Sequence, residues 1–409
     1  MVPQTPARTR IPPADPVGQT PVQDALPPVM HFQDVMIGPA PGRTRPGALW
    51  PEFHSQTHAR LFRRGRLSCA PPRFPNGAGE TVDEPVIFAS VYENHFGHLV
   101  AETVPRLPQA LAEWPDLPVV FTRLARDDSP APSAMFRAVM DWLNVPQDRV
   151  RLVTRPTLFR QVHVAAQGEH LDGPPTPAAY LDALEARIAG NLPRVTPSGV
   201  AFVTRAGLEH TQGAHAAERY LVACLRDLGV RIVYPEALNL HEQMQHYAQA
   251  AHLVFSEGSA IHGRQLLGRI DQDIAVLRRR KGSNMGRGQI GPRCRDLTYV
   301  RSFGGGLHVT NGAGAAVAFA MKSFYHMDAL LAYFDTINVP LRQRWDRKAY
   351  RQCRDQDVLS WVFAMYDPMI VPWLKPANED EYLLAQFDDL HLGHLKDKAA
   401  ALIAARRVG

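Results

Sequence analysis

Between residues 199 and 280, short apolar runs alternate with segments whose apolar residues recur at helical spacing. The runs predict strands at 199–205, 230–236, 252–257 and 273–279. The segments between them predict helices at 216–228, 239–251 and 259–268, with Asn239 as an N-cap and Gly229 just after a helix. Strands that alternate with helices of this length predict right-handed crossovers and a parallel, doubly wound sheet.

The chain before this region mixes both periodicities from His31 to about Gly168. Strands are predicted at Phe32–Ile37, Val86–Val91, Pro118–Thr122 and Val150–Thr154, and helices within 95–114, at Ser133–Leu143 and at Ala178–Ala189. The Gly- and Pro-containing stretch 169–177 predicts a break. The predicted division is a Pro-rich flexible arm (1–28), an N-terminal α/β domain (29–177), a Rossmann-like domain (178–320) and a helical C-terminal segment (321–409).

Composition narrows the class of protein. At 409 residues and 45% hydrophobic content, the chain is long enough for two globular domains with large cores. Its net charge of +5 is only weak support for an anionic partner, because an Arg-rich composition often reflects a GC-rich genome. No stretch approaches the roughly 20 apolar residues that span a bilayer, and no signal peptide is evident. The four Cys are scattered and do not suggest a framework of disulfide bonds. We expect a cytoplasmic protein.

Residues 91–107, VYENHFGHLVAETVPRL, place ionisable groups in an apolar stretch that follows a predicted strand. In a helix, His98, Glu102 and Arg106 would fall on one line at i, i+4 and i+8. Burying unpaired charge is costly, so a folding core has no reason to collect such groups. A site that takes a proton from a hydroxyl does need them.

Pro105 complicates that line of side chains. Proline inside a helix costs about 3 kcal/mol and kinks or breaks it. Either the helix bends at Pro105, or Pro105 lies in the first turn of a helix that begins later. The alternative role for Glu102 is a structural ion pair with Arg106, and the residues alone leave both roles open.

The segment SEGSAIHG (256–263) lies at the carboxyl end of a predicted strand and opens the next helix. Ligands of open parallel sheets bind at that edge, and the first N–H groups of a helix attract phosphate. Gly258 permits close approach, Ser259 can donate, Glu257 can accept from ribose hydroxyls, and His262 can support the phosphates. A tight turn capped by Ser is the alternative.

Arg205 ends another strand of the same predicted sheet, at the same edge. Arginine there can bind a diphosphate through two N–H groups, or can simply be a solvated surface residue. The run RRRK (278–281) more closely matches an exposed edge. The stretch GRGQIG (286–291) is no dinucleotide fingerprint, because no strand leads into it and Pro292 follows. His95 and His98 have the spacing of metal ligands but no evident third ligand, so no metal is expected.

Together, ENHFGHLVAETVPRL, VAFVTRAG and VFSEGSAIHG resemble glycosyltransferase family 61, including bacterial members of capsular polysaccharide synthesis. The three blocks occur in the order typical of that family and cover roughly residues 85–285. The resemblance implies a GT-B fold, in which two Rossmann-like domains face each other across a cleft. It also implies an inverting transferase that uses a nucleotide-sugar and no metal or other cofactor.

On this resemblance Glu102 matches the acidic position of the catalytic base, and His98 assists it. Four other residues match positions that line the donor nucleotide, with Gly258 in the same turn: Arg205, Glu257, Ser259 and His262. Asn94 and Arg106 are assigned supporting roles. The implied acceptor is a glycan or lipid-linked glycan, the latter bringing the protein to the inner face of the membrane.

Two other classes of function share some of these sequence features. A non-catalytic nucleotide-sugar-binding protein would keep the site at 256–263 but would not need Glu102. A nucleic-acid-binding protein would use the excess of Arg, but no basic helix interleaved with aromatic residues is present, so no nucleic-acid partner is expected.

Overall fold

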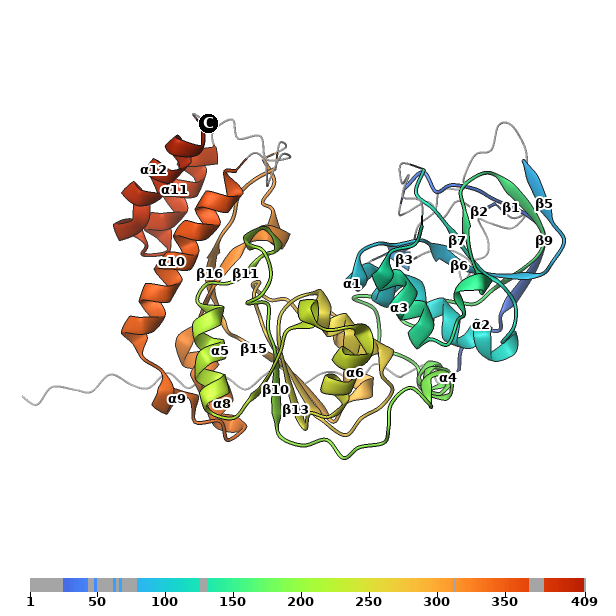
Figure 1. Ribbon diagram of the computed structural model, residues 1–409, viewed down its shortest axis with the longest axis horizontal. Coiled ribbons are helices and arrows are strands. Elements are labelled where there is room, and N and C mark those ends of the chain that lie inside the picture. The colour runs from blue at the N-terminus through green and yellow to red at the C-terminus, as the bar shows by residue number, and fades with distance from the viewer. Residues whose placement is uncertain are drawn as a thin grey trace, which may run out of the picture.

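The computed structural model describes residues 25–42, 79–125, 131–311, 314–367 and 379–407, together with the short strands at 48–49, 62–63 and 66–67. Nearly all of the predicted N-terminal arm lies outside these residues. The described chain combines sheets with helices, so the prediction of an α/β protein is confirmed. Figure 1 shows the first sheet at one side, the second in the middle and the last helices at the other side.

The first sheet is mixed and has the order β2-β1-β9-β6-β7-β8, with β5 also paired to β9. Strands β9, β6, β7 and β8 run parallel, whereas β1 and β2 add an antiparallel edge. The bounds are β1 Met30–Ile37, β2 Ala48–Leu49, β5 Glu80–Val82, β6 Val86–Val91, β7 Val119–Thr122, β8 Val150–Val153 and β9 Thr157–Val164. The sequence predicted β1, β6, β7 and β8, but not β9.

Three helices accompany this sheet: α2 (Leu107–Glu113), α3 (Ala134–Trp142) and α4 (Ala178–Ile188). A one-turn 3₁₀ helix, η4 (Gln147–Arg149), precedes β8. Ser133 caps α3 by accepting from the Phe136 amide, which explains why this helix begins where the sequence predicted.

The second sheet is entirely parallel and has the order β12-β10-β13-β14-β15. Numbered by sequence within the sheet this order is 2-1-3-4-5, so the winding reverses between β10 and β13. The predicted doubly wound sheet is therefore confirmed. The bounds are β10 Val200–Val203, β12 Arg231–Val233, β13 His252–Ser256, β14 Asp273–Leu277 and β15 Asp296–Val300.

The crossovers of this sheet follow the predicted capping signals. Helix α5 (Glu218–Asp227) is followed by Gly229, whose φ of 79° is left-handed. Helix α6 (Leu240–Ala248) follows η6 (Pro235–Ala237) and begins at Asn239 with a reciprocal capping box to Glu242. The third predicted helix differs, because residues 259–266 form a 3₁₀ helix, η7 (Ser259–Leu266), not an α-helix.

A small third sheet, of order β11-β17-β16, joins the second sheet to the C-terminal helices. Trp361 of α10 is fully buried in this last part, and its indole donates to the Ala320 carbonyl at 2.9 Å. The remaining bounds are β3 Phe62–Arg63, β4 Arg66–Leu67, η5 His210–Gln212, β11 Ala214–His215, α7 Arg287–Ile290, η8 Gly291–Arg293, β16 Phe303–Leu307, η9 Ala318–Ala320, β17 Lys322–Tyr325, α8 Met327–Thr336, α9 Leu341–Arg344, α10 Arg347–Met365, α11 Glu379–Asp389, η10 Gly393–Leu395 and α12 Lys396–Arg407.

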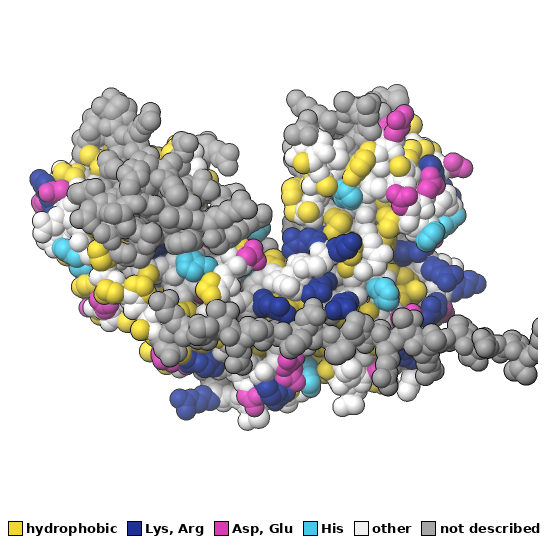
Figure 2. Space-filling model, turned by 180° about the vertical axis from the view of Figure 1, so that it is seen from behind, with side chains coloured by type: hydrophobic (Ala, Val, Ile, Leu, Met, Phe, Trp, Pro, Cys, Tyr) yellow, Lys and Arg dark blue, Asp and Glu magenta, His cyan; other side chains and the backbone are white. Residues whose placement is uncertain are grey.

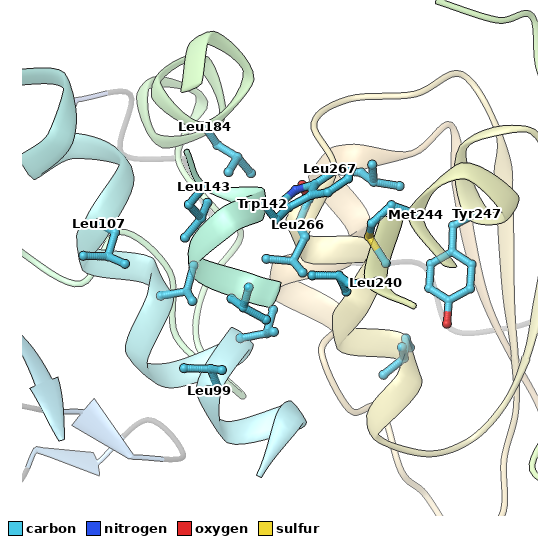
Figure 3. Close-up of a cluster of buried hydrophobic side chains, with 14 of the residues drawn as sticks. Leu99, Leu107, Trp142, Leu143, Leu184, Leu240, Met244, Tyr247, Leu266 and Leu267 are labelled. Atoms are coloured by element: carbon cyan, nitrogen blue, oxygen red, sulfur yellow. The ribbon is translucent and has the colours of Figure 1, made fainter. Parts of the chain in front are cut away.

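One hydrophobic cluster extends from the first sheet into the second. Figure 3 shows Trp142 of α3 between Leu184 and residues of the second half such as Leu266 and Leu240. The Trp142 indole also donates to the Leu266 carbonyl at 2.8 Å, which fixes α3 to the end of η7. A shared apolar core of this kind holds the two halves in one relative position.

Seen from behind, the molecular surface is hollowed between the part built on the first sheet and the part with the C-terminal helices (Figure 2). Lys and Arg side chains gather on the floor of this hollow. Within the described residues, none of the helices combines the length and the apolar character that crossing a membrane requires.

Candidate active site

The segment after β6 passes through three helix types within eleven residues. It begins with a short α-turn, α1 (Phe96–His98), continues as a π-helix, η2 (Leu99–Thr103), and tightens to a 3₁₀ turn, η3 (Val104–Arg106), before α2. The chain therefore departs from a regular helix before Pro105 as well as at it. A π-turn widens the backbone locally and occurs frequently at functional sites.

Pro105 has no N–H to donate to the Ala101 carbonyl four residues earlier. The Gln289 side chain, from α7 in the second half, donates to that oxygen at 3.0 Å. A buried carbonyl needs a donor, so the proline creates an acceptor that the second half of the chain satisfies.

Glu102 lies in the π-turn and is almost completely buried. Its Oε2 lies 2.6 Å from His98 Nδ1, so the predicted i, i+4 contact between the two is present. The His98 side chain is 20% exposed, compared with 5% for Glu102. The pair thus joins a buried carboxylate to a group that solvent reaches.

Arg106 is buried, and its Nη1 donates to the Ala165 carbonyl at 2.7 Å. Burial lowers the pKa of Arg106 to about 10. Asn94 is exposed in the turn between β6 and α1. The supporting roles of both residues stay predictions.

The α1 turn packs directly against η7 of the second half. A side-chain carbon added at Gly97 would lie 3.1 Å from His262 Cδ2, 3.3 Å from His95 Cε1 and 3.3 Å from Ser259 Cβ. The two predicted motifs therefore meet at Gly97, and only a residue without a side chain permits this approach without displacing its neighbours. His262 is 3% exposed here.

Arg205 and Gly258 follow the two strands, β10 and β13, between which the winding reverses. This switch point is where open parallel sheets bind ligands. The Arg205 guanidinium lies across Gly258, and a side-chain carbon there would be 2.0 Å from Arg205 Nη1. Arg205 Nε donates to the Gly213 carbonyl at 2.9 Å, and Nη2 donates to Gln212. Burial lowers the pKa of Arg205, although Glu218 opposes this change.

Glu218, at the start of α5, is a site residue that the sequence did not indicate. It is buried and accepts from the Arg205 amide at 2.7 Å, from Thr204 Oγ1 at 2.7 Å and from Ser256 Oγ at 3.0 Å. One carboxylate thus joins the carboxyl ends of β10 and β13.

Glu257 is also buried, and its oxygens accept from the residues that follow β14. Oε2 accepts from the Arg279 amide at 2.7 Å and the Arg280 amide at 3.1 Å, and Oε1 accepts from Arg280 Nε and Ser283 Oγ, each at 2.7 Å. Burial acts against its charged form, but Arg280 and these donors outweigh it, so the pKa of Glu257 is lowered.

Both oxygens of Glu257 thus accept from the loop that carries Arg279 and Arg280, instead of facing a ribose. Its predicted role in donor binding stays a prediction. The RRRK run, expected to be an exposed edge, differs from that expectation: Arg279 is 4% exposed, whereas Arg280 is partly exposed and bonded to Glu257. Within the described part of the chain, no group of three or more His, Cys, Asp or Glu could hold a metal ion.

Changing Gly258 to Ala is expected to displace the Arg205 guanidinium, because the added carbon overlaps Nη1. Binding of a nucleoside diphosphate should weaken by about tenfold or more, the cost of misplacing one charged hydrogen bond. Calorimetric titration measures this. Gly190→Ala is the matched control, since nothing lies within 4 Å of its added carbon. Unchanged affinity in Gly258→Ala would separate Arg205 from ligand binding.

Residues 96–264 match the sequence model of the family Glycosyltransferase 61. Among solved structures, the dodecameric iron-containing heptosyltransferase TibC, in complex with ADP-D-β-D-heptose, is similar with 14% identity and a TM-score of 0.23, over 62% of this chain and 74% of that one. A comparison with curated proteins finds no match. The matched segment begins at α1 and ends within η7, and it supports the assignment of the chain as a glycosyltransferase.

Proposed function

We propose that the protein transfers a sugar from a nucleotide-sugar to a hydroxyl of a glycan acceptor, with inversion at the anomeric carbon and without a metal. The observation that most supports this is the meeting of two unlike groups at Gly97. Buried Glu102 and its partly exposed partner His98 come from the first half, and the turn at Ser259–His262 comes from the second. Both lie inside the matched segment.

In the proposed reaction Glu102 accepts the proton of the acceptor hydroxyl as its oxygen attacks the anomeric carbon. A carbon–oxygen bond forms to the acceptor while the bond to the diphosphate breaks, and the diphosphate leaves with the electron pair. Attack from the face opposite to the leaving group inverts the configuration. His98 orients the Glu102 carboxylate and can pass the proton that Glu102 has accepted toward solvent.

The leaving diphosphate gains negative charge, which the cations at the switch point would stabilise. Arg205 directs Nε and Nη2 to backbone carbonyls, so the remaining N–H groups, which lie over Gly258, are placed for phosphate oxygens. Arg280 is held nearby by Glu257. Both cations are partly buried, so water screens their attraction for phosphate less than it would at a fully exposed position.

We further infer that the two sheets represent the two halves of a GT-B arrangement, with the acceptor on the side of the first sheet and the nucleotide on the second. The biological setting that fits such a transferase is cell-surface polysaccharide synthesis, for example of a capsule. A lipid-linked acceptor would place the protein in the cytoplasm at the inner face of the membrane.

A panel of nucleotide-sugars tests the proposed function. The purified protein is incubated with each donor and a set of glycan acceptors, with and without EDTA, while nucleotide release and glycan mass are measured. Turnover with at least one donor, undiminished by EDTA, supports the proposal. Binding of a nucleotide-sugar without turnover across a broad acceptor set would favour the non-catalytic binding protein.

With the nucleotide identified in this way, Arg205→Ala is expected to weaken binding of the nucleoside diphosphate by about 10–100-fold. The nucleoside alone should bind almost as well as before, because it lacks the phosphates that the guanidinium contacts. Isothermal titration of both ligands measures the difference. Arg226→Ala, on the exposed face of α5, is the control. Equal losses for both ligands would assign Arg205 a structural role only.

A further inference from the structure

Two buried glutamines link His262 to the backbone of the Glu102 turn. Gln265 Nε2 lies 3.1 Å from His262 Nδ1 and 2.9 Å from Gln289 Oε1, and Gln289 Nε2 lies 3.0 Å from the Ala101 carbonyl oxygen. All three side chains are at most 3% exposed. The chain of contacts crosses from η7 through α7 to the π-turn of the first half.

The Ala101 carbonyl fixes the direction of every hydrogen bond in this chain. A carbonyl oxygen only accepts, so the Gln289 amide nitrogen must face it, and the Gln289 oxygen must face Gln265. Gln265 must then present its nitrogen, whose two hydrogens serve Gln289 and His262. His262 Nδ1 is therefore an acceptor, and the proton of the neutral ring is on Nε2.

The ring environment agrees with a neutral histidine. Burial, together with the nearby His98 and His95, lowers the pKa of His262 to about 3, although Glu102 acts in the opposite direction. Arg280, the remaining charged neighbour, also disfavours a second proton on the ring. His262 is thus a neutral hydrogen-bond donor at neutral pH.

Nε2 is flanked by two residues that have no side chain. Its bonded neighbours are Cδ2, which faces Gly97, and Cε1, which lies 3.9 Å from a carbon added at Gly286. Among the described residues, none accepts a hydrogen bond from Nε2. The edge of the ring that carries Nε2 therefore lies beside Gly97 of α1.

We propose that Gln265 and Gln289 are positioning residues that keep the His262 proton on Nε2, where it donates to an oxygen of the donor diphosphate. This inference rests on the proposed function and deepens it. Phosphate oxygens at neutral pH accept and do not donate, so an imidazole lone pair at Nε2 would repel them. The two glutamine side chains prevent that arrangement. They also link His262, which donates the hydrogen bond to phosphate, to the turn that holds Glu102.

Nitrogen NMR of histidine-labelled protein tests the tautomer without any turnover, with His262 assigned by mutation. We expect an unprotonated Nδ1 and a protonated Nε2 at every pH between about 6 and 8. A histidine with an ordinary pKa near 6.5 would titrate within this range, so the range distinguishes the two cases. Gln265→Glu should reverse the pattern, because a carboxylate accepts from Nδ1–H. Gln245→Glu, at an exposed position of α6, is the control. A wild-type Nδ1–H, or titration in this range, overturns the proposal.

Binding of inorganic pyrophosphate tests the donor role. A glutamine amide nitrogen can replace Nε2, whereas an asparagine nitrogen reaches only the position of Nδ1. His262→Gln should therefore retain most of the affinity, and His262→Asn should lose about 10–100-fold. Equal affinities of wild type and His262→Asn overturn the donor role even if the tautomer is as expected. In that case the donor panel still decides glycosyl transfer independently, so the two failures are distinguishable.

Discussion

Replacing Glu102 by Gln is expected to lower the rate of glycosyl transfer by a factor of about 10²–10⁴ and to leave donor binding largely intact. General-base catalysis contributes an acceleration of that size, and an amide cannot take the acceptor proton. Gln has the shape of Glu and its oxygen can still accept from His98 Nδ1, so the buried π-turn should keep its conformation. Product formation with the identified donor measures the rate, and calorimetry measures donor affinity.

Glu113→Gln is the matched control for this experiment, because Glu113 lies on α2, the helix into which the same segment continues, and is exposed. It should transfer sugar at the wild-type rate. A Glu102→Gln variant that keeps more than about a tenth of that rate would be too active for the loss of a general base and would assign the carboxylate a structural role. Comparable losses of rate and donor affinity would also contradict the assignment.

Local signals predicted much of the fold. The capping box at Asn239 and the left-handed Gly229 are determined by neighbouring residues, so sequence indicated where the helices begin and end. Strand β6 was predicted with its observed bounds because it is buried throughout. Strand β9 was missed although it lies inside the first sheet, because exposed Arg160 and Gln161 interrupt its apolar pattern.

The candidate site was predictable where its residues lie within one segment, or at one edge of the predicted sheet as Arg205 and Gly258 do. The contact of His98 with Glu102 follows from i, i+4 spacing. Gln289 could not be found this way, because it lies in GRGQIG, a stretch for which the sequence suggested no functional role. Its role depends on a carbonyl 188 residues away. A clue was present in Pro105, since its missing N–H requires another donor for Ala101.

Packing between the halves explains how these distant residues can work together. Trp142 and Leu266 belong to the same apolar cluster, and their hydrogen bond joins α3 to η7. With the relative position of the halves fixed by a shared core, the separation between Glu102 and the cations of the second sheet is fixed as well. If these are the reacting groups, as we propose, they need no large domain movement to reach one another.

The stretch at 169–177, predicted from sequence as a break, contains a buried charge that forms an ion pair with the second half. Glu169 Oε2 accepts from Arg293 Nη1 and from Thr176 Oγ1, each at 2.8 Å, and both members of the ion pair are at most 1% exposed. Burial raises the pKa of Glu169, although Arg293 and Thr176 oppose this change. Arg293 also donates to the backbone of Gln289, so the ion pair supports the glutamine chain.

Glu169→Gln is therefore expected to lower the free energy of unfolding by about 3–5 kcal/mol, because it leaves the Arg293 cation buried without its counter-charge. Chemical denaturation monitored by tryptophan fluorescence measures the change. Glu84→Gln breaks the ion pair with Arg151, both of whose side chains are more than 40% exposed, and should cost less than about 1 kcal/mol. Equal losses of stability in the two variants would mean that water screens Arg293 as it screens the exposed Arg151. The buried pair would then not hold the halves together.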